Sequence, residues 1–400
     1  MITWGMNGTH LQKQVILRKN EEHRIVGGHP WVFSNEVRET HGSPAIGDVV
    51  ELLTAGGITL GIGLYNPHSL IAFRLLSQII EEIDTEFFRS RLTHALNLRQ
   101  TLYPDSATYR LVHGEGDFLP GLIIDRFNEY CVVQTHSHGM DLRLPMICDA
   151  LESVVAPKGI IERNESPMRT LEELPLKKGI LRGEAGTTTI TMDGLKYRVD
   201  VLEGQKTGFF LDQRENRSAI ARFSKSAEVL DCFCNDGGFS LSAARAGAAA
   251  VTGLDSSEEA VRNATENASL NSLPGVRFER ADIFEALPAL AKKEAKFDLV
   301  ILDPPSFTRS RKNVQTAKKG YKELHTGAFR LLKKGGTLAT ASCSHHIEPD
   351  VFQSIVDETA RKAGRRIQLL EWRGAAPDHP TLPAVPETRY LKFGIFRIMD

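Results

Sequence analysis

Glu-Val-Leu-Asp-Cys-Phe-Cys-Asn-Asp-Gly-Gly-Phe, residues 228–239, is the pattern of an apolar strand followed by a glycine turn and a helix start. In open α/β sheets, ligands bind at the carboxyl ends of strands, where such turns lie. The Gly-x-Gly-x-x-Gly fingerprint of dinucleotide sites is absent, so this turn does not predict a pyrophosphate site. Taken alone, the stretch also fits a tight turn that binds no ligand.

The chain after residue 212 alternates between the two kinds of element. Strand patterns lie at residues 228–233, 250–254, 276–280, 298–302 and 337–341, and helical patterns at 239–246, 257–272, 284–293, 318–333 and 348–363. This alternation predicts right-handed βαβ units and a doubly wound parallel sheet. Residues 367–372 and 390–398 complete seven strands, and no helical pattern separates this last pair, so we predict an antiparallel edge strand. The arrangement is typical of methyltransferases that use S-adenosylmethionine (SAM), rather than of dehydrogenases.

The earlier part of the chain predicts two further domains. Short strands at residues 12–17, 48–53, 58–65 and 71–76 indicate a small β-rich domain, with a barrel as one form. Residues 86–103 have helical apolar spacing and act as a connector. Two strands within 122–135, a helix at 141–155 and a hairpin turning at Asp193-Gly194 indicate an α+β domain. We therefore predict domains at residues 11–85, 86–203 and 204–400.

Composition sets limits on the class of protein. The 400 residues are 41% hydrophobic and 25% charged, as in ordinary water-soluble proteins, and are too many for one core. No run approaches eighteen apolar residues and residues 1–10 do not resemble a signal peptide, so we expect neither a membrane span nor export. Five cysteines, an odd number, favour reduced thiols in a cytoplasm. The net charge of −1 argues against a uniformly basic nucleic-acid binder but allows local basic patches.

Acidic residues follow successive predicted strands. Asp255 comes about twenty residues after the glycine turn, where a carboxylate accepts ribose hydroxyls. Asp282 follows the third strand and is expected at the adenine amino group, and Asp303 ends the fourth. The turn itself contributes further expected cofactor contacts: Asp231, Asp236, Gly237, Gly238 and Phe239. Each aspartate is equally explained as a helix cap when taken singly, but four acidic strand ends together favour a SAM site.

The segment Asp303-Pro304-Pro305-Ser306-Phe307 predicts a rigid turn, because two prolines cannot continue the strand. Such a turn holds Asp303 beside the methyl donor and the target base, with Phe307 available for stacking. Similar Asp/Asn-Pro-Pro turns occur in enzymes that methylate exocyclic amines, so the motif predicts a methyltransferase without identifying the acceptor atom.

Cys343 ends the fifth predicted strand, in Thr340-Ala341-Ser342-Cys343-Ser344, forty residues after Asp303. The fifth strand should neighbour the fourth, so the sulfur is expected in the same site as Asp303. Carbon 5 of cytosine is a poor nucleophile, and addition of a thiolate at carbon 6 makes it an enamine that accepts a methyl group. We interpret the other four cysteines as small buried hydrophobic residues: Cys131, Cys148, Cys232 and Cys234. No second cysteine pair completes a zinc site, so no metal is expected.

At this point the chain resembles the bacterial large-subunit (23S) ribosomal RNA cytosine-C5 methyltransferases over nearly its whole length. The resemblance rests on these segments: His29-Pro30-Trp31-Val32-Phe33-Ser34, Leu119-Pro120-Gly121-Leu122-Ile123-Ile124-Asp125-Arg126, Lys206-Thr207-Gly208-Phe209-Phe210-Leu211-Asp212-Gln213-Arg214, the Asp-Pro-Pro and Ser-Cys-Ser segments, and Ala376-Pro377-Asp378-His379-Pro380. It implies an N-terminal RNA-binding PUA domain, a central α+β domain and a C-terminal SAM-binding domain.

The resemblance also implies roles for single residues. Cys343 is implied to be the nucleophile, and the segment from Lys206 to Arg214 is implied to border the cofactor, with Phe210 and Gln213 among its contacts. Better-known RNA cytosine methyltransferases carry a second cysteine after the fourth strand, and none stands there in this chain. The base that removes the proton from carbon 5 is therefore open, with Asp303 or a water molecule as candidates.

An acid-free basic run follows the Asp-Pro-Pro turn: Arg309, Arg311, Lys312, Lys318, Lys319 and Lys322. It fits contacts to RNA phosphates, and it equally fits a solvated loop. We assign Pro304, Pro305, Phe307, Arg309, Arg311 and Lys312 to the RNA substrate.

The sequence thus predicts a cytoplasmic SAM-dependent methyltransferase that forms 5-methylcytosine in large-subunit ribosomal RNA. The target base must leave its stack to be reached, unless the RNA is already single-stranded. A related enzyme that methylates a guanine nitrogen, without covalent catalysis, is the first alternative. An RNA-binding protein with an inactive methyltransferase fold is the second, and a nicotinamide enzyme is the most distant. A homodimer is compatible with the sequence.

Overall fold

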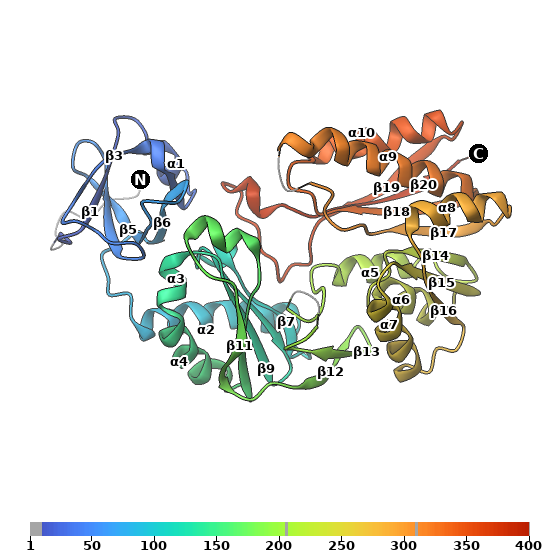
Figure 1. The fold of residues 1–400 in the computed structure, drawn as a ribbon, viewed down its shortest axis with the longest axis horizontal. Coiled ribbons are helices and arrows are strands. Elements are labelled where there is room, and N and C mark those ends of the chain that lie inside the picture. The colour runs from blue at the N-terminus through green and yellow to red at the C-terminus, as the bar shows by residue number, and fades with distance from the viewer. Residues whose placement is uncertain (1–9, 205–206, 309–310, 400) are drawn as a thin grey trace. The chain divides into compact units, whose positions relative to one another are not determined.

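The structure is a computed structural model that describes residues 10–204, 207–308 and 311–399. The chain divides into two compact units, which Figure 1 shows in ribbon form. Unit 1 holds the described residues up to Thr188, together with Val199–Phe209 and Pro377–Thr388. Unit 2 holds Thr189–Arg198, Phe210–Ala376 and the residues from Arg389 onward. The three-domain division at residues 11–85, 86–203 and 204–400 stays a prediction.

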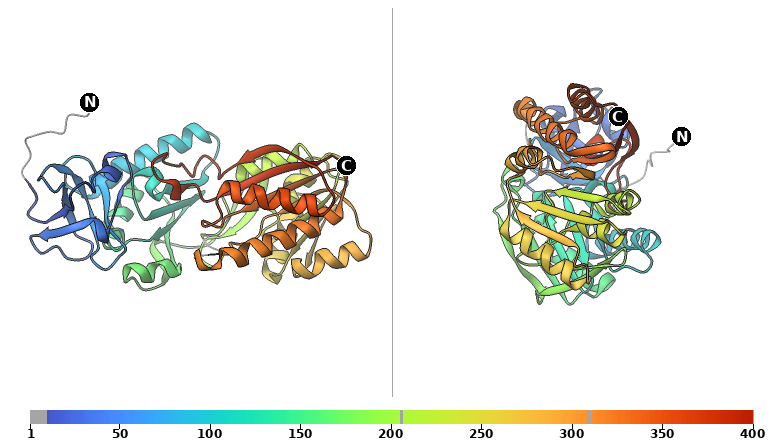
Figure 2. Two further views of the ribbon diagram at one scale, coloured as in Figure 1. Left: turned by 90° about the horizontal axis from the view of Figure 1, so that it is seen from above. Right: turned by 90° about the vertical axis from the view of Figure 1, so that its right-hand side faces the viewer.

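Unit 2 is built, within its described residues, on a seven-stranded sheet in the order β16-β15-β14-β17-β18-β20-β19 (Figure 2). The strands are β14 (Glu228–Cys232), β15 (Ala250–Asp255), β16 (Val276–Arg280), β17 (Phe297–Leu302), β18 (Leu332–Ser342), β19 (Ile367–Arg373) and β20 (Lys392–Ile398). The strands β14 to β18 run parallel to one another. β20 runs antiparallel to both of its neighbours. The predicted doubly wound α/β class is therefore confirmed.

The last two strands pair antiparallel; β19 forms the edge, and β20 lies inside the sheet. The predicted antiparallel edge strand is therefore present, although the sequence did not indicate which of the two strands forms the edge. Burial explains this order, because all but one residue of β20 are buried whereas β19 has only exposed and half-buried residues. A nearly continuous buried run suits a strand covered on both faces.

Helices cover both faces of this sheet (Figure 1). On one face lie α8 (Ile283–Lys292), α9 (Val314–Leu331) and α10 (Pro349–Lys362), where Leu324 packs in one core with Leu230. On the other lie α5 (Arg214–Ala221), α6 (Gly238–Arg245) and α7 (Glu258–Leu270), where Ile220 packs in one core with Val229. Adjacent residues of β14 thus serve opposite faces, as the pleat of a strand requires.

The N-terminal part of unit 1 is a β-rich domain. It holds a six-stranded sheet, in the described residues, in the order β2-β6-β5-β4-β1-β3. Its elements are β1 (Gln14–Leu17), α1 (His23–Val26), β2 (Trp31–Phe33), β3 (Val37–His41), β4 (Val49–Leu53), β5 (Thr59–Tyr65) and β6 (Ile71–Ser77). The four predicted strands are present, whereas the short strands β2 and β3 escaped prediction.

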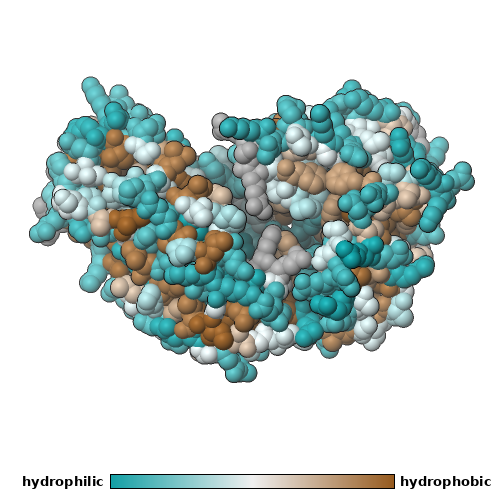
Figure 3. All heavy atoms as spheres, in the orientation of Figure 1, coloured by the Kyte–Doolittle hydropathy of each residue, from teal (hydrophilic) through white to brown (hydrophobic). Residues whose placement is uncertain are grey.

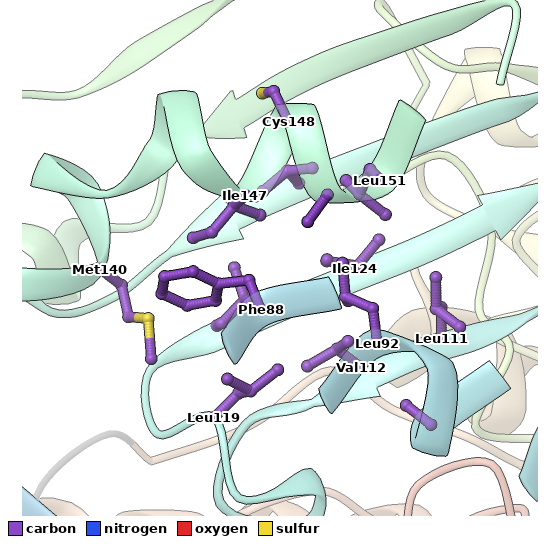
Figure 4. Close-up of a cluster of buried hydrophobic side chains, with 14 of the residues drawn as sticks. Phe88, Leu92, Leu111, Val112, Leu119, Ile124, Met140, Ile147, Cys148 and Leu151 are labelled. Carbon is purple, nitrogen blue, oxygen red and sulfur yellow. The ribbon is translucent and has the colours of Figure 1, made fainter. Parts of the chain in front are cut away.

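The central part of unit 1 is a five-stranded sheet, within the described chain, in the order β11-β10-β9-β8-β7. Its elements are α2 (Thr85–Leu102), β7 (Thr108–His113), β8 (Leu122–Phe127), β9 (Tyr130–Thr135), α3 (His138–Leu142), α4 (Leu144–Val155), β10 (Gly159–Asn164) and β11 (Lys177–Gly183). Figure 4 shows Phe88 and Leu92 of α2 and Ile147 of α4 around Ile124 of β8, in the core of this part.

A hairpin follows this sheet and confirms the predicted turn. β12 (Thr187–Met192) pairs with β13 (Leu195–Asp200) across Asp193 and Gly194. Both turn residues have positive φ, at 49° and 75°. Turns of this kind match the right-handed twist of the flanking strands.

Large exposed hydrophobic side chains are concentrated in unit 1, and Figure 3 shows brown patches among hydrophilic surface on its visible face. They include Leu70, Leu142, Met168 and Leu171. Across residues 10–204, 207–308 and 311–399, no helix combines the length and apolar character that crossing a bilayer requires.

Candidate active site

Asp231 is a fully buried carboxyl group at the end of β14. Its Oδ2 accepts hydrogen bonds from the backbone N of Ser240, at 3.0 Å, and from the Ser240 hydroxyl, at 2.7 Å. Its Oδ1 is buried and has no hydrogen-bond partner among the described residues. Burial raises the pKa of Asp231 to about 7, and the nearby charges of Asp303 and Asp255 contribute to the rise. The two hydrogen bonds from Ser240 lower this pKa but do not cancel the effect of burial. This oxygen is therefore suited to a ligand that brings a hydrogen-bond donor.

The turn between β14 and α6 has an unusual backbone. Phe233, Asn235 and Gly237 have φ values of 64°, 46° and 81°. A left-handed conformation at a bulky residue such as Phe233 is rare and costs about 1–3 kcal/mol. Strain of this size persists only where the surrounding structure enforces it, and it is concentrated at functional sites.

The two glycines of this turn are enclosed by side chains. A Cβ at Gly237 would lie 2.9 Å from Cζ of Phe278, and one at Gly238 would lie 2.4 Å from Nε of Arg217. We predicted that these glycines allow a ligand close to the backbone. The structure adds a second requirement, because Phe278 and Arg217 already fill the space beside them.

Asp255 ends β15 and connects it to this turn. Its Oδ2 accepts from the backbone N of Asn235 at 3.0 Å, and its Oδ1 accepts from the backbone N of Ser257 at 2.9 Å. β14 lies between β15 and β17, with Cys232 opposite both Leu254 and Leu302, so the ends of these three strands are neighbours. The charges of Asp255 and Asp303 each raise the pKa of Asp231. The structure thus brings together three of the four predicted acidic strand ends.

The fourth strand end, Asp282, and the turn residue Asp236 differ in burial. Asp236 is nearly buried, and burial raises its pKa to about 6. Its Oδ1 lies 3.4 Å from Nδ2 of Asn263. Asp282 is exposed and caps α8, with Oδ1 accepting from the backbone N of Phe284 at 2.8 Å. The alternative interpretation, a helix cap, is therefore confirmed for Asp282, and its predicted contact with adenine stays a prediction.

Gln213 connects the segment before α5 to the end of β17. Its Nε2 donates to Oδ1 of Asp303 at 3.0 Å, while its Oε1 accepts from Nδ2 of Asn216 at 2.6 Å. Only 3% of Gln213 is exposed. The pair of hydrogen bonds therefore orients both the amide and the Asp303 carboxylate.

The other residues of this predicted segment lie differently. Lys206 falls outside the described residues. Phe210 is half-buried. Arg214 is buried, and its Nε donates to Oδ1 of Asp193 in the hairpin turn at 3.3 Å. Phe239 is a core residue whose ring stacks on Phe393 at 5.7 Å between centroids. These placements leave the predicted cofactor contacts of Phe210, Arg214 and Phe239 as predictions.

Arg217 is a site residue that sequence reasoning missed. It lies on α5, beside Gly238, and its charge lowers the pKa of Asp236 against burial. Arg217 follows Arg214 by three residues and so belongs to the same side of α5. That spacing was the available signal, although nothing in it indicated the contact with the glycine turn.

The Asp-Pro-Pro turn is anchored by its last residues. Phe307 packs against Tyr321 at 4.8 Å and Phe284 at 6.1 Å between ring centroids. Its half-buried ring holds the turn in place through these contacts, and the predicted stacking on a base stays a prediction. Pro304 is buried and Pro305 is exposed.

Cys343 directly follows β18, which pairs with β17 in the register Leu302 to Thr340. The predicted neighbourhood of the fourth and fifth strands is therefore confirmed. Of the five cysteines, all in described segments, Cys343 alone is partly exposed. The prediction that the other four are buried is confirmed. Cys343 packs at the edge of the core cluster that contains Ala341 and Phe393.

Ser344 ties the Cys343 segment to the Asp-Pro-Pro turn. Its Oγ accepts from the backbone N of Phe307 at 3.1 Å and lies 3.3 Å from Oγ of Ser306. The hydroxyl of Tyr321 lies 3.1 Å from the same Oγ and donates to Oγ of Ser342 at 2.9 Å. The two strand ends are thereby held in one arrangement, and sequence reasoning did not foresee this network.

Part of the predicted basic run falls outside the described residues. Arg309 lies outside the described residues. Arg311 belongs to the short helix η4 (Arg311–Asn313), and its side chain is not described. Lys312 and Lys319 are exposed, whereas Lys322 forms an ion pair with Glu358 at 2.7 Å.

Comparisons with known proteins agree with this architecture. A model of S-adenosylmethionine-dependent methyltransferases matches residues 179–397, and a model of PUA-like domains matches residues 15–78. A relative from Aeromonas hydrophila, named ribosomal RNA large subunit methyltransferase I, is 38% identical over 96% of this chain and 98% of its own. A relative of the same name from Escherichia coli is 35% identical, and the match covers 96% of this chain and 99% of the relative.

Solved structures share the fold. One is a crystal structure described as a methyltransferase complexed with SAH, and it has a TM-score of 0.84. The two sequences are 20% identical, and the match covers 96% of this chain and 99% of the other. SAH is the product that SAM leaves after giving up its methyl group. The chain thus belongs to the S-adenosylmethionine-dependent methyltransferases, in the family of ribosomal RNA large subunit methyltransferase I.

Proposed function

We propose that this protein methylates carbon 5 of a cytosine in large-subunit ribosomal RNA, with Cys343 as a covalent nucleophile. The observation that carries the proposal is the placement of Cys343, which alone among the five cysteines is partly exposed and which follows the strand beside Asp303. The names of the relatives support ribosomal RNA as the substrate. The PUA-like domain at residues 15–78 is proposed to bind RNA as well.

The cofactor site proposed here fits SAM by its chemistry. The methionine part of SAM carries an ammonium group, and the buried Oδ1 of Asp231 has no partner among the described residues. Asp255 and the strained turn at 233–237 follow the same sheet edge. When bound, SAM supplies an electrophilic methyl group. The residues of this chain then hold the ribose and the methionine part and exclude water.

The proposed reaction begins with the thiolate of Cys343, which attacks carbon 6 of the cytosine and forms a carbon–sulfur bond. The electron pair moves to carbon 5, and carbon 5 accepts the methyl group. Asp303, or a water molecule beside it, takes the proton from carbon 5. The electron pair of that C–H bond re-forms the double bond and expels the Cys343 thiolate. Gln213 orients Asp303 for this role through its 3.0 Å hydrogen bond.

Substitution of Cys343 tests this proposal. We expect Cys343→Ala to abolish methyl transfer from labelled SAM to ribosomal RNA prepared from cells that lack the enzyme. Cys148→Ala is the matched control, because it removes a buried thiol from the core of unit 1 and should retain turnover. Bisulfite sequencing should find one cytosine that is protected only after reaction with the active enzyme.

Two outcomes would count against the proposal. Retained turnover of Cys343→Ala would exclude the covalent mechanism. A methyl group found on a guanine nitrogen would favour the alternative enzyme, for which Cys343 is incidental.

A further inference from the structure

Lys392 is a buried charged residue for which the proposed reaction gives no role. It begins β20, and 3% of its surface is exposed. In the antiparallel pairing of β18 with β20, it lies opposite Ser342, the residue before Cys343. Burying a charge is costly unless hydrogen bonds and opposite charges compensate for it. The position of Lys392 therefore calls for an explanation.

Two hydrogen bonds hold the ammonium group of Lys392. Its Nζ donates to the backbone oxygen of Ser344 and to that of Tyr390, each at 2.8 Å. Ser344 directly follows Cys343, so the lysine side chain extends from opposite Ser342 to a point beyond the cysteine. The charge is thus fixed to the backbone that carries the thiol.

The two side chains belong to opposite faces of the sheet. Cys343 packs with Ala341, whereas Lys392 lies opposite Ser342 and shares its face, since paired residues of neighbouring strands point the same way. The ammonium is nevertheless bonded to the carbonyl oxygen of the residue next to Cys343, and attraction by Cys343 opposes the fall of the Lys392 pKa, so the two groups interact electrostatically. A fixed cation near a thiol favours the thiolate, and it does so more strongly where little water intervenes.

The titratable groups around this pair come from several elements. They are Tyr321 of α9, Asp303 after β17, Tyr390 before β20, and His345 and Glu348 between β18 and α10. Burial raises the pKa of Tyr321 to about 12, so this group stays neutral. Burial lowers the pKa of Lys392 to about 8, while attraction by Cys343 and then by Glu348 opposes the effect. At pH 7 the lysine is therefore mainly protonated.

We propose that the buried ammonium of Lys392 stabilises the thiolate of Cys343, both when it attacks and when it is expelled. The proton of the thiol leaves to water, and the lysine keeps its own. Lys392 acts through Cys343, so it is a positioning residue for the nucleophile. This inference rests on the proposed function for its purpose, but the state of the thiol can be measured without RNA or cofactor.

The test is the pH dependence of Cys343 alkylation by iodoacetamide, followed by mass spectrometry of the peptide that contains Cys343. In the wild-type protein, we expect a midpoint below the ordinary thiol value of about 8.5. Lys392→Met should raise the midpoint and slow alkylation at pH 7 about ten-fold or more. Lys392→Arg should restore the wild-type profile. Lys333→Met is the matched control, because Lys333 is half-buried near the start of β18, in ion pairs with Glu228 and Asp298, and its loss should leave the profile unchanged.

Several results would overturn the inference. A wild-type midpoint at or above about 8.5 would do so even if no Lys392 variant folds. The inference would also fail if Lys392→Met folds, as verified by thermal melting, and its alkylation midpoint is unchanged. It would fail as well if the midpoint shifts in Lys392→Met but is not restored in Lys392→Arg. Methyl transfer by Cys343→Ala would instead refute the proposed function, while leaving the measured effect on the thiol intact.

Discussion

Replacing Asp231 with Asn removes a buried titratable group from the end of β14 while keeping its volume. In the unfolded chain this carboxyl group ionises near pH 4, whereas burial raises its pKa to about 7 in the folded protein. The folded protein thus holds a proton that the unfolded chain has already lost. Stability from this group is complete below about pH 4 and is lost as the pH rises towards about 7.

The size of the effect follows from the two pKa values. The difference between about 7 and the ordinary 3.8 corresponds to at most about 4 kcal/mol. Most of this loss falls above pH 5, so the Asn variant should gain about 2–3 kcal/mol relative to wild type between pH 5 and pH 8. The same variant should bind SAM more weakly, because the carboxylate that we assign to the ammonium group of SAM is gone.

Urea unfolding of the cofactor-free proteins at both pH values measures the first effect, and calorimetry measures the second. Asp282→Asn is the matched control, since Asp282 is an exposed helix cap and its loss should cost the same at both pH values. If the difference between Asp231→Asn and wild type is equal at pH 5 and pH 8, the account of the buried carboxyl group is refuted. Unchanged SAM affinity would refute its role in binding.

Three further predictions concern the turn, the link between strand ends and the basic helix start. Gly237→Ala should lower the free energy of unfolding in urea by about 2–3 kcal/mol, because the new methyl group meets Phe278 at 2.9 Å. Gly247→Ala is the control: it has a similar φ but open space, and should lower the same free energy by about 1 kcal/mol. Equal losses would contradict the steric argument. Ser344→Ala should lower kcat roughly ten-fold, since small misplacements slow catalysis sharply, with an unchanged KM for SAM; an unchanged kcat would show that the link is dispensable. Replacing both Lys312 and Lys319 with Glu should weaken RNA binding. It should also reduce the slope of log affinity against log salt concentration by about 0.7 per lost phosphate contact. An unchanged slope in filter binding would show that these lysines do not contact RNA.

The regular part of the fold was predictable because each element carries its own pattern. The alternation after residue 212 gave the strands of the unit 2 sheet to within a few residues, apart from an earlier start of β18 at Leu332. The order of the last two strands was not predictable. Burial of β20 comes from neighbours on both faces, and no local pattern states which of two adjacent strands is inserted into the sheet.

The site was predictable where a residue lies at the end of a strand or just after it. Asp231, Asp255, Asp303 and Cys343 all do so, and strand ends of a parallel sheet meet at one edge. Arg217, Ser344 and Lys392 escaped because their roles depend on partners distant in the sequence. In the sequence, for example, Lys392 looks like an ordinary strand residue, and only the pairing of β20 with β18 places it beside the Cys343 segment.

The central claim is a covalent bond between Cys343 and carbon 6 of the target cytosine. RNA that carries 5-fluorocytidine tests it directly, because carbon 5 then holds fluorine and no proton can leave to release the enzyme. In the presence of SAM, the wild-type protein should form an RNA complex that survives denaturation, and the peptide that contains Cys343 should carry the nucleotide. Cys343→Ala should form none. A wild-type enzyme that methylates ordinary RNA yet never forms this complex, or a complex that persists in Cys343→Ala, would contradict the account.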